Sequence, residues 1–151
     1  YDTFIKEFKD SKSEPILELI AKAYVNKGVA LEKLGESQKA IDDYDVFIQE
    51  FKYTKSKHIS ELVAKAYINK GAALEKLGDS QKEIAVYDAI IHDFRHSKTE
   101  PILEQVAKAY FNKGITLGES QIAIDVYDTL IEEFKDTKSK SILVLVVKAY
   151  I

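Results

Sequence analysis

The sequence predicts an all-α fold, a solenoid of antiparallel helix hairpins. The chain repeats itself with a period of about 43 residues, and within each repeat the apolar residues recur at helical spacing. Hydroxyl residues, prolines and glycines then mark where each helix begins and ends. A single hairpin cannot bury its apolar side alone, so repeats of this kind stack on one another.

The repeat is visible as a Tyr-Asp pair that begins each unit, at Tyr1, Tyr44, Tyr87 and Tyr127. The spacing is 43 residues twice and then 40, and residues 1–43 match residues 44–86 at 29 of 43 positions without a gap. We therefore expect one repeat array over residues 1–151, and we expect it to be part of a longer array. Its units are 1–43, 44–86, 87–126 and a partial unit, 127–151.

Each unit contains one shorter and one longer amphipathic helix. In the shorter helix 37–52 the apolar residues form one stripe at steps of three and four: Ala40, Ile41, Tyr44, Phe47, Ile48 and Phe51. The longer helix 14–34 has a broader stripe, from Ile16 to Leu34, which suits a helix that is contacted on two sides. The predicted helices are 2–9, 14–34, 37–52, 57–77, 80–95, 100–117, 119–135 and 139–151.

The ends of the helices carry their own signals. A hydroxyl residue stands just before each longer helix, where it can accept a hydrogen bond from the first free N–H groups. These residues are Ser13, Ser56, Thr99 and Ser139. Pro15 and Pro101 fall in a first helical turn, where the missing N–H does no harm. The longer helices end at Gly35, Gly78 and Gly118.

Glycine also recurs in the middle of the longer helices, at Gly28, Gly71 and Gly114. A glycine inside a helix costs roughly 1 kcal/mol relative to alanine. We interpret these positions as crossings where two helices lie too close together for a side chain.

The stretch 23–44 reads A-Y-x-N-x-G-x-x-L-x-x-L-G and then A-I-x-x-Y, and two slightly altered copies follow it. This motif resembles the signature of the tetratricopeptide repeat (TPR) family. The resemblance implies a right-handed superhelix of helix hairpins whose function is to bind proteins. The unit here is longer than the family's 34 residues, with the surplus around residues 51–63, so the chain resembles a long-repeat variant. The third unit lacks three residues, which predicts a shortened long helix.

The resemblance also implies a binding site. In TPR proteins the longer helix lines the concave face, where asparagines hold a peptide backbone and lysines hold carboxylates. The mixed apolar and basic stripe on these helices favours an extended acidic peptide, or one with a free C-terminal carboxylate. The predicted site residues are Lys22, Val25, Asn26, Val29, Lys65, Ile68, Asn69, Lys108, Phe111, Asn112 and Lys148. Recent duplication of an inert repeat would produce the same recurrence, so both interpretations stay open.

Other classes of function have little support. A net charge of −3 argues against nucleic acid, and no apolar run approaches the roughly 20 residues of a membrane span. This predicts a soluble protein and leaves its compartment open, with the cytoplasm favoured. His92 and His96 have a spacing that can bind zinc, but they align with ordinary surface residues. Cysteine, nucleophile motifs and phosphate loops are absent, so we expect no enzyme activity, metal or cofactor.

Two alternatives to peptide binding remain: a purely structural or oligomerising array without a ligand groove, and a regulatory appendage of a larger enzyme. The ends of the chain bear on the first. Val144 and Val147 stand where other units have glutamate and alanine, and helix 2–9 lacks a preceding partner. Both ends expose faces that repeats normally bury, which predicts packing against further repeats or self-association with another copy.

Overall fold

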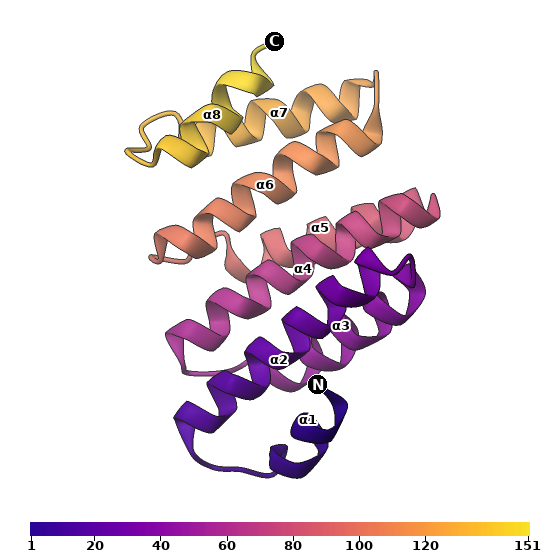
Figure 1. The fold of residues 1–151 in the computed structure, drawn as a ribbon. Coiled ribbons are helices and arrows are strands. Elements are labelled where there is room, and N and C mark those ends of the chain that lie inside the picture. Colours follow the sequence, from indigo (N-terminus) through magenta and orange to yellow (C-terminus); the bar gives the residue numbers. More distant parts are fainter. The chain divides into compact units, whose positions relative to one another are not determined.

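The computed structural model describes all residues, Tyr1–Ile151, and contains eight α-helices and no strand (Figure 1). The helices are α1 (Asp2–Phe8), α2 (Glu14–Lys33), α3 (Ser37–Phe51), α4 (Lys57–Leu77), α5 (Ser80–Phe94), α6 (Glu100–Leu117), α7 (Gln121–Phe134) and α8 (Lys140–Ala149). The all-α prediction is confirmed, and every predicted helix end lies within two residues of the observed one.

The chain divides into two compact units, Tyr1–Asp79 and Ser80–Ile151. In the first unit α2 packs against α1, α3 and α4, and α3 also packs against α4. The core lies around α3, where Tyr44 and Phe47 are fully buried. The ring of Tyr24 on α2 stacks on Phe47 with 5.7 Å between the ring centroids. The two long helices α2 and α4 are neighbours in this unit.

The second unit has the same order of short and long helices. Here α6 packs against α5, α7 and α8, and α8 also contacts α7. Ile90 of α5, Leu130 of α7 and Ile142 of α8 are almost completely buried. Within each unit, helices that are consecutive in sequence pack on one another, which is the packing expected of stacked helical hairpins.

The glycine predictions are confirmed at five positions. Gly35, Gly78 and Gly118 follow the longer helices with positive φ (78°, 73° and 63°), which glycine adopts without steric cost. In mid-helix, a Cβ on Gly28 would overlap the Tyr44 ring, and one on Gly114 would overlap the Tyr127 ring. At these two crossings, a tyrosine ring of the following short helix therefore fills the space that any side chain larger than that of glycine would need.

The predicted side-chain caps are wrong, although Ser13, Ser56, Thr99 and Ser139 do occupy the N-cap positions. None of their hydroxyls accepts a hydrogen bond from its helix. Instead the hydroxyl two residues earlier accepts from the N–H of the cap residue, as Thr54 Oγ1 does from Ser56 N at 3.2 Å. The same bond recurs before each long helix. This local turn fixes the backbone just before the helix through the earlier hydroxyl and leaves the hydroxyl of the cap residue out of the bond.

Two further boundaries differ from the prediction. Ser120 is extended and accepts from Ala123 N at 3.1 Å, so α7 begins at Gln121 rather than at residue 119. Leu34, predicted as part of the apolar stripe, lies just beyond α2 and is exposed. The shortened long helix of the third unit is confirmed: α6 has 18 residues, against 20 in α2 and 21 in α4.

Candidate binding surface

The predicted site residues lie on the four long helices, in two groups. Those of α2 and α4 belong to the first unit, and those of α6 and α8 belong to the second. Because α2 contacts α4 and α6 contacts α8, each unit brings two rows of the set side by side. We call the whole set the long-helix stripe. It comprises Lys22, Val25, Asn26, Val29, Lys65, Ile68, Asn69, Lys108, Phe111, Asn112 and Lys148.

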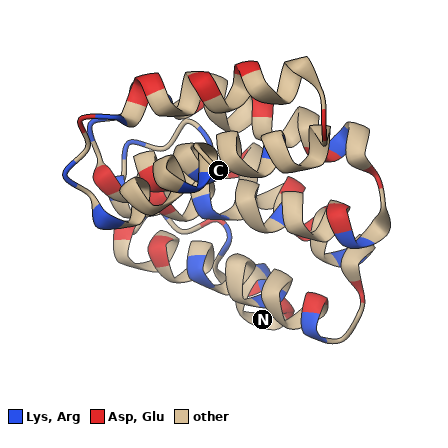
Figure 2. Ribbon diagram, turned by 90° about the horizontal axis from the view of Figure 1, so that it is seen from above, with Lys and Arg blue, Asp and Glu red and all other residues tan.

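The lysines of the stripe carry uncompensated charge. Lys22, Lys65 and Lys148 are exposed and Lys108 is half-buried. No ion pair or hydrogen bond engages any of the four, although acidic and basic residues are both spread over the fold (Figure 2). The first unit thus presents Lys22 and Lys65 on adjacent helices, and the second presents Lys108 and Lys148. Helices in contact lie about 8–10 Å apart, so each pair can meet two acidic groups of one ligand.

The three asparagines are not equivalent. Asn26 is exposed and has no hydrogen-bond partner in the protein. Asn112 Nδ2 donates to Tyr87 Oη of α5 at 3.5 Å, at the long limit of a hydrogen bond. Asn69 Nδ2 is buried without a hydrogen-bond partner, although Asn69 lies close enough to the Tyr44 hydroxyl to counter part of the rise that burial causes in the Tyr44 pKa. Only Asn26 offers its whole amide to a ligand.

The apolar members of the stripe also differ in exposure. Val25 is 3% exposed and belongs to the core, because α2 is contacted by three other helices; a ligand on the stripe would therefore scarcely touch its side chain. Ile68 and Phe111, at the equivalent positions of α4 and α6, are half-buried. The Phe111 ring lies 5.9 Å from the Tyr127 ring of α7. A ligand would meet only the outer part of these side chains.

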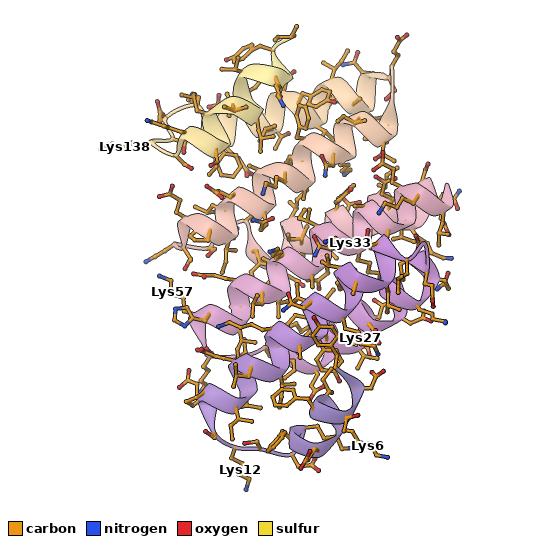
Figure 3. All side chains as sticks on the ribbon, in the orientation of Figure 1. Lys6, Lys12, Lys27, Lys33, Lys57 and Lys138 are labelled. Carbon is orange, nitrogen blue, oxygen red and sulfur yellow. The ribbon has the colours of Figure 1, made fainter.

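Three other lysines, which are not among the predicted site residues, tie α2, α4 and α6 to the short helix before each. The pairs are Lys27–Asp2, Lys70–Asp45 and Lys113–Asp88. All three span 25 residues, a signal that the recurring Tyr-Asp pair could have revealed. Figure 3 labels Lys27 on α2, and this lysine also donates to Asp43 at 3.0 Å. Burial lowers its pKa, but the hydrogen bonds to Asp2 and Asp43 outweigh burial and raise it overall.

Outside the stripe, the polar groups singled out by the sequence are the two histidines with zinc-binding spacing. His92 and His96 are exposed, and His92 contacts only the carboxylate next to it, Asp93, at 3.0 Å. No group of three or more histidine, aspartate or glutamate side chains lies close enough to hold a metal ion. An open hollow of about 620 Å³ in the second unit is lined by Arg95 and Glu133, which neutralise each other.

A family model of the tetratricopeptide repeat matches residues 21–45 and 64–91. These stretches include the stripe residues of α2 and α4. No curated protein and no solved structure is similar enough to this chain to count as a match. None of the helices has both the length and the apolar character that a membrane crossing demands.

Proposed function

We propose, starting from the chain's membership of the tetratricopeptide repeat family, that it is an interaction scaffold that holds an extended acidic segment of another protein on the long-helix stripe. Repeats of this family generally mediate protein–protein interaction, bind proteins or peptides and are typically non-catalytic. The observation that carries the finer proposal is the contrast between two sets of lysines. Lys27, Lys70 and Lys113 are neutralised within the fold, whereas the four lysines of the stripe are not.

The geometry suggests a pattern for the ligand. An extended peptide rises about 3.3 Å per residue, and neighbouring helices lie about 8–10 Å apart. A peptide that crosses two long helices therefore meets successive lysines about every three residues. An aspartate or glutamate at every third position, or one such residue three positions before a C-terminal carboxylate, fits this spacing. The half-buried Ile68 and Phe111 add apolar contact beside the charges.

Fluorescence anisotropy with a labelled Asp-x-x-Asp-x-x-Asp peptide tests the proposal. Lys22→Ala with Lys65→Ala should weaken binding at least tenfold, equivalent to about 1.4 kcal/mol. The matched control is Lys12→Ala with Lys57→Ala, which removes the same charge from two exposed lysines outside the stripe (Figure 3). The control should change affinity less than twofold. Equal weakening by both pairs would show non-specific attraction and would contradict a site on the stripe.

An oligomerising array is the second candidate function. It is favoured by one specific observation, an exposed apolar face on α8 that includes Val144 and Val147. The two functions use different surfaces, because the stripe and this face do not share a residue.

A further inference from the structure

The loops that lead into the long helices hold a surplus of basic residues. In the first unit, residues 9–14 before α2 contain two lysines and two acidic residues, and residues 52–57 before α4 contain three lysines and no acidic residue. In the second unit, residues 95–100 contain two basic residues and one acid, and residues 135–140 contain three lysines and one acid. Each pair of loops therefore has a net charge of +3, although the whole chain has a net charge of −3.

The fold brings the two loops of the first unit to one edge. Helices α2 and α4 pack against each other and begin on the same side of the unit, so the loops before them are neighbours (Figure 1). Figure 3 shows Lys12 and Lys57 where these two helices begin. We call residues 9–14 and 52–57 the basic edge. Its lysines Lys12, Lys55 and Lys57 are exposed, and no ion pair engages them.

Two acidic side chains near the basic edge already have basic neighbours. Glu18 Oε1 lies 3.1 Å from His58 Nδ1. Burial raises the pKa of Glu50, and the nearby Lys9 opposes that rise. These carboxylates therefore take little away from the charge of the exposed lysines.

The acidic cluster of the first unit lies further from the basic edge. It consists of Asp42, Asp43 and Asp45 on α3. Asp45 is its nearest member to Phe51, the last residue of α3, and the helical rise puts about 9 Å between them. That distance exceeds the Debye length of about 8 Å at physiological ionic strength. A partner at the basic edge is therefore attracted by the lysines more than it is repelled by this cluster.

The loop 52–57 also has an exposed aromatic ring. Tyr53 is 85% exposed, and Lys52 Nζ lies 4.6 Å from the centre of its ring. Tyrosine is enriched at membrane–water interfaces, where its ring lies at the level of the headgroups, and lysines close to the membrane are attracted by anionic lipids. Single-stranded nucleic acid also stacks on aromatic rings, but it follows a positively charged groove. The lysines here lie on loops at the ends of helices, which suits a broad anionic surface better.

We propose that the basic edge docks on an anionic lipid surface. Each lysine near such a surface strengthens binding about fivefold, so a few lysines give weak, reversible binding that added salt removes. The corresponding loops of the second unit have the same net charge and provide a second contact of the same kind. The basic edge shares no residue with the long-helix stripe, so the inference does not depend on peptide binding.

Vesicle flotation tests the inference with two matched pairs of substitutions in the first unit. The unmodified chain should bind vesicles of phosphatidylcholine with phosphatidylserine and should not bind vesicles of phosphatidylcholine alone. Lys12→Ala with Lys57→Ala should weaken binding at least about tenfold. Lys22→Ala with Lys65→Ala removes the same charge from the stripe and should change vesicle binding less than about twofold. The effects of the two pairs on binding of the Asp-x-x-Asp-x-x-Asp peptide should be reversed.

A fluorescent reporter places the contact on the loop. The chain contains no tryptophan, so Tyr53→Trp introduces a single indole beside the lysines of the basic edge. Its emission should shift to shorter wavelengths when anionic vesicles are added, because the ring leaves water for the headgroup region. Val46→Trp is the control, since Val46 on α3 is 50% exposed and lies outside the basic edge. The emission of this control should not shift.

Three results would overturn the inference: an unmodified chain that does not bind anionic vesicles, equal weakening by the two lysine pairs, or an unchanged Tyr53→Trp emission. A single-stranded RNA oligonucleotide that binds more tightly than the vesicles, and loses affinity with Lys12→Ala and Lys57→Ala, would assign the basic edge to nucleic acid instead. Helical circular dichroism confirms that each variant is folded. If the peptide fails to bind while the vesicles bind, only the proposed function of the stripe is contradicted.

Discussion

Gly28 shows at the scale of one residue why these helices accept an unfavourable amino acid. A side chain at this position would overlap the ring of Tyr44. That ring cannot easily move, because Tyr44 is fully buried and its hydroxyl donates to Glu32 at 3.0 Å. The local cost of glycine is thus offset by the close approach of α2 and α3.

Alanine at Gly28 is expected to destabilise the protein by about 1–3 kcal/mol through overpacking. This loss should exceed the roughly 1 kcal/mol that alanine gains in helix propensity. Gly114→Ala should cost less, because its neighbour Tyr127 is only half-buried and its ring has room to shift. Urea unfolding measures both changes. A Gly28→Ala protein that is as stable as the unmodified one would show that the Tyr44 ring moves to make room for the new methyl group.

A buried polar pair in the second unit replaces two alanines of the first. Thr116 Oγ1 donates to Glu83 Oε1 at 2.8 Å, and Glu83 is buried. The equivalent positions in the first unit are Ala40 and Ala73, both fully buried. The polar pair and the small apolar pair are therefore two solutions to the same contact between neighbouring helices.

Removing one partner of this pair should lower the free energy of unfolding more than removing both partners. Thr116→Ala leaves the buried carboxylate without its donor and should cost about 1–3 kcal/mol of unfolding free energy. Adding Glu83→Ala recreates the alanine pair of the first unit and should recover most of that loss. A double-mutant cycle by urea unfolding measures the coupling. Purely additive losses would mean that the hydroxyl does not satisfy Glu83.

At the scale of the element, the helix starts depend on a turn that precedes them. Thr54 Oγ1 accepts from Ser56 N before α4, whereas the Ser56 hydroxyl makes no cap. Thr54→Ala should therefore cost about 0.5–1.5 kcal/mol, the net contribution of one hydrogen bond. Ser56→Ala should be close to neutral. Thermal unfolding of the two variants measures both losses. If Ser56→Ala were the less stable variant, the Ser56 hydroxyl would be the cap of α4 after all.

A tyrosine joins α6 to α7 and makes the second unit sensitive to alkali. Burial raises the pKa of Tyr110 to about 12, and the nearby Glu133 carboxylate adds to the rise. The folded state therefore favours the neutral phenol, and this contribution is complete below about pH 10, the ordinary tyrosine pKa. It is lost as pH rises from there through the folded pKa.

Stability should accordingly fall between about pH 10 and pH 12, and Tyr110→Phe should make that fall shallower. Tyr24 and Tyr44, whose pKa values burial also raises, should keep part of the dependence in the variant. Urea unfolding at a series of pH values gives the slope. Identical slopes for the variant and the unmodified chain would contradict the pKa shift of Tyr110.

The sequence predicted helix positions well because period and turn glycines are local properties of the chain. Gly35 and Gly78 mark helix ends by a backbone conformation that needs no neighbour. It predicted side-chain roles less well, because these depend on the helix packed opposite. The burial of Val25 and the bond from Asn112 to Tyr87 both arise from a second helix, and neither is visible in one stretch of sequence.

At the scale of the whole molecule, the positions of the charges say more about binding than the net charge does. A net charge of −3 conceals two populations of lysine on the same helices. Lys27, Lys70 and Lys113 each pair with an aspartate 25 residues earlier and hold neighbouring helices together. The stripe lysines, exemplified by Lys22 and Lys65, form no ion pair within the chain. The repeat thus carries a structural set and a candidate binding set side by side.

The most direct test of the binding proposal is an NMR map of backbone amide shifts during titration with the Asp-x-x-Asp-x-x-Asp peptide. We predict that the shifts concentrate on α2 and α4 around Lys22, Asn26 and Lys65, with a second group on α6 and α8 around Lys108 and Lys148. The short helices α3 and α7 should change little. Shifts that centre on the short helices, or a saturating titration that leaves the long helices unchanged, would contradict the proposal.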